Sequence, residues 1–135
     1  MTHLLDTSAF LAFFFDEKGS EQVRSLFEDN DNKVAISVLT ELEFWARLKA
    51  LRREKNFETE WHLTTSLFDA ILGIDDAVAD CAVALRRLAT RRLPTIDALI
   101  AATASVRGLI LVHRDPHFRA IPATRLAQLD LGAAP

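Results

Sequence analysis

The sequence predicts an α/β fold with a central, mostly parallel β-sheet flanked by α-helices. Short apolar runs at residues 4–5, 34–36 and 109–112 alternate with longer segments that have helical spacing. Strands that alternate with helices in this way are typical of parallel sheets whose faces are covered by helices. The sequence contains no internal repeat, low-complexity segment or linker, so we expect residues 1–135 to form a single domain.

The first elements are expected to be a strand, two helices and a second strand. Residues 4–5 form the first strand, and Asp6-Thr7-Ser8 has the side chains that commonly start a helix. The apolar residues that follow extend this helix to residue 15, where a polar segment interrupts it. A second helix ends at the turn-forming residues 29–32, and residues 34–36 form the second strand.

The middle of the chain is expected to be helical, because its apolar residues recur at intervals of three and four positions. One helix is predicted from residue 38 to about 53 and another from about 57 to 71. Residues 72–74 would form a strand of minimal length, and Asp75-Asp76 starts the next helix.

The last third of the chain is expected to contain a central helix followed by a strand. Thr95 is predicted to cap this helix, which runs over residues 96–107 and closes at Gly108. It is apolar nearly all round, which indicates a position inside the fold. Residues 109–112 form the strongest predicted strand, and a final short strand is expected near residues 126–129.

The composition is that of an ordinary globular domain. Half of the 135 residues are hydrophobic, which is enough for a core without disulfides. The net charge of −3 does not by itself indicate a nucleic-acid-binding protein, although local basic patches determine phosphate contacts. Cys81 is the single cysteine, which excludes an internal disulfide and indicates a reduced, cytoplasmic protein. No apolar stretch approaches the roughly 20 residues that span a bilayer, so we expect no membrane contact and no secretory signal.

Four carboxylates carry the strongest indication of function. Asp6, Glu41, Asp97 and Asp115 each lie where a short apolar run ends or a helical pattern begins. The carboxyl ends of parallel strands meet at one edge of a sheet, so we expect these side chains to lie close together. Clustered acids repel one another, and a hard divalent cation with oxygen ligands is the simplest compensating charge.

Each acid also has a purely structural explanation. Asp6 could be a helix N-cap, Asp97 could interact with the helix dipole, and Asp115 could start a turn. Glu41 could be a solvated helix residue, with Glu43 beside it in a capping box. Four such acids in four separate segments are harder to explain in this way than any one of them.

Other chemistries fit the sequence poorly. The four glycines are scattered, so there is no glycine-rich phosphate loop, and there is no Gly-x-Ser-x-Gly nucleophile motif. The histidines do not form a metal-binding pair on one helix. Asp6 resembles the nucleophile of an aspartyl-phosphate phosphatase, but Ser8 stands where the second aspartate of such enzymes is expected.

Four segments, taken in order, resemble PIN-domain ribonucleases, and in particular VapC-like toxins of type II toxin–antitoxin systems. The segments are residues 4–12, 36–42, 96–104 and 111–118, and together they span nearly the whole chain. The resemblance implies a PIN-like domain. It also implies that Asp6, Glu41, Asp97 and Asp115 are the metal-binding acids. One departure is His113, where this family more often has Thr or Ser.

The resemblance also implies a mechanism, namely metal-dependent hydrolysis of RNA phosphodiester bonds. Mg²⁺, or Mn²⁺ as a substitute, would be held by Asp6, Asp97 and Asp115. Glu41 would bind the metal, hold its water or act as general base. Three further residues are candidates for contacts with the substrate: Thr7, Ser8 and Arg114.

The partners implied by the resemblance are an RNA substrate (tRNA, rRNA or mRNA), a small cognate antitoxin and a second copy of the chain. The large apolar residues between Val38 and Ile71 are the natural surface for a protein partner, because a domain of this size has difficulty burying all of them. Two alternatives remain open at this point, a PIN-like interaction module without catalysis and a related nuclease outside a toxin pair.

Overall fold

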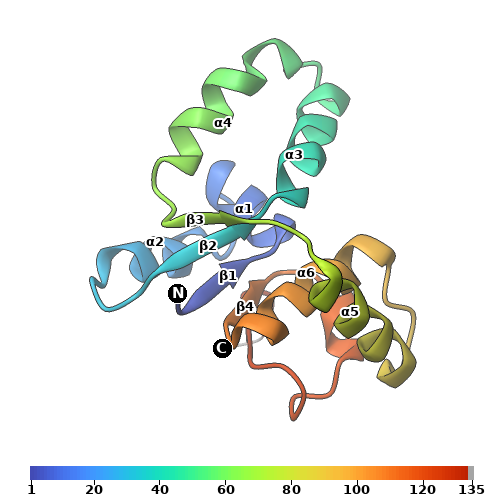
Figure 1. The fold of residues 1–135 in the computed structure, drawn as a ribbon. Coiled ribbons are helices and arrows are strands. Elements are labelled where there is room, and N and C mark those ends of the chain that lie inside the picture. Colours follow the sequence, from blue (N-terminus) through green and yellow to red (C-terminus); the bar gives the residue numbers. More distant parts are fainter. Residues whose placement is uncertain (134–135) are drawn as a thin grey trace.

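The computed structural model describes residues 1–133 and contains a five-stranded β-sheet with helices on both faces (Figure 1). The strands are β1 (His3–Leu5), β2 (Val34–Ser37), β3 (Ala70–Leu72), β4 (Ile110–His113) and β5 (Gln128–Asp130). Their order is β3-β2-β1-β4-β5, and every neighbouring pair is parallel. The predicted α/β fold with a parallel central sheet is therefore confirmed.

The helices divide between the two faces of the sheet. Residues 1–133 contain the α-helices α1 (Thr7–Phe14), α2 (Ser20–Glu28), α3 (Leu39–Ala50), α4 (Phe57–Thr65), α5 (Asp76–Leu88) and α6 (Thr95–Arg107). They also contain two short 3-10 helices, η1 (Glu54–Asn56) and η2 (Pro116–Ala120). Side chains on successive strand positions point to opposite faces. Leu4 and Leu111 accordingly pack with α5 and α6, whereas Leu5 and Val112 pack with α1 to α4.

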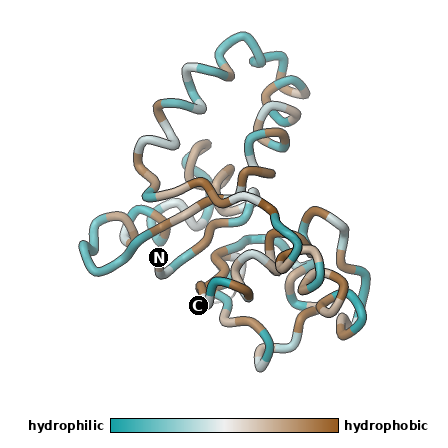
Figure 2. The backbone as a smooth tube through the Cα atoms, in the orientation of Figure 1, coloured by the Kyte–Doolittle hydropathy of each residue, from teal (hydrophilic) through white to brown (hydrophobic). Residues whose placement is uncertain are grey.

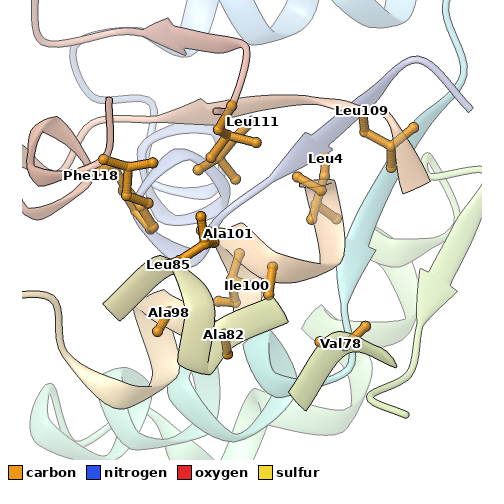
Figure 3. Close-up of a cluster of buried hydrophobic side chains, with 14 of the residues drawn as sticks. Leu4, Val78, Ala82, Leu85, Ala98, Ile100, Ala101, Leu109, Leu111 and Phe118 are labelled. Atoms are coloured by element: carbon orange, nitrogen blue, oxygen red, sulfur yellow. The ribbon is translucent and has the colours of Figure 1, made fainter. Parts of the chain in front are cut away.

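Helix α6 lies at the centre of one of these two cores, as its sequence predicts. Ala98, Ile100 and Ala101 are at most 1 % exposed and pack with Leu4 of β1 and Phe118 of η2 (Figure 3). The alanines allow the helix to approach the sheet and α5 closely. The helix ends at Gly108, whose φ of 67° places it in the left-handed region that favours glycine.

Helices α3 and α4 form an arm that projects away from the sheet (Figure 1). At its base an aromatic cluster anchors the arm to α1: the ring of Phe10 lies 5.1 Å from that of Phe44 and 5.7 Å from that of Trp61. Phe44 and Trp61 are buried, but Trp45 is 38 % exposed, in keeping with the expectation that this segment cannot bury all its large apolar residues.

Hydrophobic and hydrophilic residues alternate along helices α3 and α4 (Figure 2). Within residues 1–133, no helix combines the length and apolar character that crossing a membrane requires.

Two predicted boundaries are wrong. Helix α4 ends at Thr65 rather than near residue 71, because Ile71 belongs to β3 and pairs with Ile36 of β2. Strand β3 accordingly begins at Ala70, two residues before the predicted strand at 72–74. Asp69 fixes this change of direction, since its Oδ2 accepts a hydrogen bond of 2.7 Å from the backbone N–H of Val34. Strand pairing with β2 thus outweighs the helical spacing of the apolar residues before it.

The predicted helix cap at Thr95 is also wrong. Thr95 is the first residue of α6, and no side chain caps the helix at Pro94. Pro94 occupies the N-cap position instead, and its carbonyl accepts a hydrogen bond of 2.8 Å from the backbone N–H of Ala98.

Ile100→Ala should destabilise the fold by about 2–5 kcal/mol, because it leaves a cavity beside a fully packed helix. Val106→Ala, on the same helix but 45 % exposed, is the matched control and should change the free energy of unfolding by less than about 0.5 kcal/mol. Urea denaturation of the three proteins measures both values. Similar losses in both variants would contradict the central position of α6.

Candidate metal centre

The site lies where the strand order reverses between β1 and β4. In open parallel sheets, ligands bind in the crevice outside the carboxyl ends of strands at such a point. Asp6 directly follows β1, and Asp115 follows β4 by two residues. A pocket of about 350 Å³ opens here. It is lined by Asp6, Thr7, Ser8, Leu11, Glu17, Glu43, Arg47, Asp97, Arg114, Asp115 and Pro116.

Asp6 is almost fully buried, and its carboxylate accepts hydrogen bonds from a backbone N–H and from a side-chain hydroxyl. It caps α1 by accepting a hydrogen bond of 2.8 Å from the backbone N–H of Ala9, as predicted. The Ser8 hydroxyl lies 2.7 and 2.8 Å from its two carboxylate oxygens. Burial raises the pKa of Asp6 to about 7, and the nearby charge of Asp115 adds to this rise, which outweighs the opposing effect of the hydrogen bonds.

Ser8 connects the ends of the two central strands. Its hydroxyl donates to the carboxylate of Asp6 and accepts a hydrogen bond of 2.8 Å from the backbone N–H of Arg114. One hydroxyl thus fixes the residue after β1 relative to the residue after β4. These contacts give Ser8 a positioning role at Asp6, and the substrate contact expected from the sequence stays a prediction.

Asp97 lies in the first turn of α6, which packs on the face of the sheet opposite to α1. Its pKa is raised to about 6, first by burial and then by the charges of Asp115 and Glu43. His117 opposes this rise, because its Nδ1 lies 3.2 Å from Asp97 Oδ2. The same nitrogen lies 3.1 Å from Asp115 Oδ1, which also accepts the backbone N–H of His117 at 2.9 Å.

The fourth acid at the site is Glu43 rather than the predicted Glu41. Glu43 lines the pocket and accepts a hydrogen bond from the Thr7 hydroxyl, which also lies 3.1 Å from the hydroxyl of Thr40. Glu41 is exposed and does not line this pocket. Residues two positions apart on an α-helix point about 200° apart, so only one of the two glutamates can face the other acids.

His113 supports Asp115 through the backbone. The imidazole is completely buried, and its Nδ1 accepts a hydrogen bond of 3.2 Å from the backbone N–H of Asp115. Because Nδ1 accepts, the ring proton is on Nε2, which donates to Gln128 Oε1 at 2.9 Å. Burial lowers the pKa of His113, in keeping with a neutral ring. The departure noted at His113 therefore still provides a supporting contact to Asp115.

Two arginines line the pocket within residues 1–133. Arg114 lines the pocket, but its guanidinium binds Glu17 at 2.9 Å and the carbonyl of Lys18 at 3.1 Å. The other arginine that lines the pocket, among the described residues, is Arg47 of α3.

The donor set fits a hard divalent cation. Asp6, Glu43, Asp97 and Asp115 offer carboxylate oxygens, the ligands that Mg²⁺ and Mn²⁺ prefer. The pKa values of Asp6 and Asp97 are raised partly by neighbouring negative charge, so the protein itself does not fully compensate the cluster. A bound cation would supply the missing charge.

The sequence matches the PIN domain family over residues 3–123, and no curated protein matches it. A toxin–antitoxin complex from Klebsiella pneumoniae contains a chain that is 26 % identical, with a TM-score of 0.71 over 96 % of this chain and 98 % of that one. VapBC-5 from Mycobacterium tuberculosis, a member of the VapBC family of toxin–antitoxin systems, is 25 % identical, with a TM-score of 0.69 and the same coverage. DNA-bound VapBC from Salmonella typhimurium has the same fold, with a TM-score of 0.78, 19 % identity and coverage of 97 % and 98 %.

The raised pKa values predict how the stability of the metal-free protein depends on pH. Asp6 and Asp97 have pKa values of about 7 and about 6 in the fold, against about 3.9 in an unfolded chain. The folded state therefore binds these protons more tightly. That contribution to stability is complete below about pH 4 and is lost as the pH rises to about 7, at about 1.4 kcal/mol per unit of pKa difference.

Asp6→Asn should remove the larger part of this pH dependence, because Asn still accepts the Ala9 N–H but has no proton to lose. Urea unfolding in the presence of a chelator, from pH 4 to pH 8, measures the effect. The variant should gain stability relative to the wild type across this window. Parallel pH profiles for the two proteins would contradict the assignment.

Proposed function

The chain belongs to the PIN domain family, and from this membership we propose that it is a metal-dependent endoribonuclease and the toxin of a VapBC-type pair. The observation that carries the proposal is the convergence of Asp6, Glu43, Asp97 and Asp115 at the point where the strand order reverses. These acids come from four separate segments of the chain.

The residues around the acids suit phosphodiester hydrolysis. Asp6, Asp97 and Asp115 would hold a divalent ion, with Mg²⁺ as the cofactor and Mn²⁺ as a substitute. When bound, such an ion offsets the negative charge of the phosphate and lowers the pKa of a water molecule. Asp6 needs a fixed position for this role, and the bonds from Ser8 and Ala9 provide it.

Glu43 is the candidate general base. Its Oε1 accepts the Thr7 hydroxyl, which leaves Oε2 for the proton of an attacking water or for the ion. The Thr7 hydroxyl fixes this carboxylate and is itself held against the hydroxyl of Thr40, which is fully buried.

RNA must approach this acidic pocket through a limited number of cations. Arg47 is exposed, lies one helical turn beyond Glu43 on α3 and lines the pocket, so it is the candidate for binding a phosphate beside the scissile bond. Arg114 contributes by holding the loop after α1 in place through Glu17 and Lys18.

The proposed protein partners are a small antitoxin and a second copy of the chain, both in the cytoplasm. The α3–α4 arm supports this part of the proposal, because its exposed apolar side chains have little to contact within the chain. These residues are Leu42, Trp45, Leu51, Leu63 and Leu67. The relative from Klebsiella pneumoniae belongs to a toxin–antitoxin complex, which supports the proposed antitoxin.

Purified wild-type protein should cleave labelled RNA in a manner that depends on Mg²⁺ or Mn²⁺, and Asp97→Asn should abolish the cleavage. Asn keeps the size of Asp97 but lacks the anionic oxygen that a hard cation requires. Incubation with tRNA, mRNA and single-stranded DNA, with and without the ions, tests the substrate class. Growth arrest on expression, relieved by Asp97→Asn, tests the toxin role. Intact RNA and undisturbed growth with the wild type would leave an interaction module as the better assignment.

Glu43→Gln and Glu41→Gln form a matched pair that tests which glutamate acts. Glu43→Gln should lower the cleavage rate by about 10²–10⁴-fold, the usual contribution of a general base. Glu41→Gln should leave the rate within about three-fold of the wild type, since surface substitutions away from a site cost little. Single-turnover cleavage measures both rates. The opposite order would restore Glu41 to the site.

A further inference from the structure

His117 lies at the acidic site but has no part in the mechanism above. Its imidazole Nδ1 is 3.2 Å from Asp97 Oδ2 and 3.1 Å from Asp115 Oδ1, so one nitrogen approaches two carboxylates from different elements. Together these three side chains can each offer one ligand atom, all within 4.8 Å of one another.

The backbone around His117 is fixed rather than free. Its N–H donates to Asp115 Oδ1 at 2.9 Å, and the next residue, Phe118, is fully buried. The ring of Phe118 packs 4.9 Å from that of His113, which in turn holds the backbone of Asp115. The position of His117 relative to Asp115 is therefore set by the core and not by the contact between their side chains.

The spacing of these atoms matches that of neighbouring ligands around one ion. Two donors at right angles, each about 2.1 Å from an octahedral ion, lie about 3.0 Å apart. The two distances from Nδ1 are close to this value. An imidazole nitrogen that already lies this close to both acids can join the coordination without rearrangement of the backbone.

We propose that His117 Nδ1 is a direct ligand of the ion held by Asp97 and Asp115, which makes the centre a mixed nitrogen and oxygen site. This inference rests on the proposed metal-dependent function and adds a preference to it. Both Mn²⁺ and Mg²⁺ bind carboxylate oxygens, but Mn²⁺ is a first-row transition-metal ion that also accepts an imidazole nitrogen, whereas Mg²⁺ gains little from one. The centre therefore binds Mn²⁺ in preference to Mg²⁺.

Calorimetric titration of the metal-free protein with Mn²⁺ and with Mg²⁺ tests the proposal. His117→Gln should weaken Mn²⁺ binding by at least about ten-fold, equivalent to about 1.4 kcal/mol, and should change Mg²⁺ binding much less. His62→Gln is the matched control, because His62 is an exposed histidine on α4 and is absent from the candidate ligand group. Pulsed electron paramagnetic resonance of the Mn²⁺-loaded wild type should show a coordinated nitrogen, and the signal should disappear in His117→Gln.

Asp97→Asn separates this inference from the proposed function. Mn²⁺ binding that depends on Asp97 but not on His117, with no nitrogen signal, overturns the ligand role of His117 and leaves the metal-dependent nuclease intact. Absence of Mn²⁺ binding to the wild type overturns both. The side chain of His117 is 44 % exposed, so the fold of the variant should persist, and thermal unfolding of the metal-free proteins verifies this.

Discussion

Carboxylates at the carboxyl ends of β1 and β4 are buried near one another, and the surrounding hydrogen bonds partly offset the cost of that burial and of the repulsion that adds to it. Asp6 has the greatest cost, because it is 2 % exposed, and it receives hydrogen bonds from Ser8 and Ala9. Asp97 and Asp115 share one side-chain partner, the Nδ1 atom of His117, which lies close to a carboxylate oxygen of each. These donors reduce the electrostatic cost without removing it, since the pKa values of Asp6 and Asp97 remain raised. The fold thus keeps an acidic site whose negative charge the described residues do not fully compensate.

Both cores of the domain contribute to this arrangement. Asp6 begins α1 and Glu43 lies on α3, on one face of the sheet, whereas Asp97 lies on α6, on the other. The central β1–β4 pairing joins the two faces, and the backbone N–H of Asp6 extends it by donating to the carbonyl of Val112 at 3.0 Å. A substitution that disturbs the packing on either face of the sheet therefore displaces the acids relative to one another.

Much of the fold could be predicted from the sequence, because local signals agree with the packing. The cap at Asp6 and the glycine at the end of α6 are local features, and the all-round apolar pattern of α6 reflects its burial. The end of α4 could not be predicted, because pairing of Ile71 with β2 depends on residues far away in the chain.

At the site, Asp6, Asp97 and Asp115 could be predicted because each lies at or near the end of a strand or the start of a helix. The choice between Glu41 and Glu43 depends on the rotation of α3, which the sequence alone does not determine. A usable signal existed in the spacing of Thr40, Glu43 and Arg47, which lie three and four positions apart and so share one face of the helix. His117 could not be assigned to the acidic cluster from the sequence, because a single histidine in a short 3-10 helix has no periodic pattern.

The α3–α4 arm also determines the intrinsic fluorescence of the protein. Both tryptophans are on this arm, Trp61 buried in the aromatic cluster and Trp45 exposed, and the sequence contains no tyrosine. Intrinsic fluorescence therefore arises from the arm, with one emitter in an apolar environment and one in contact with water. A partner that covers the arm shifts the emission of Trp45, whereas events among α5 and α6 leave the spectrum unchanged.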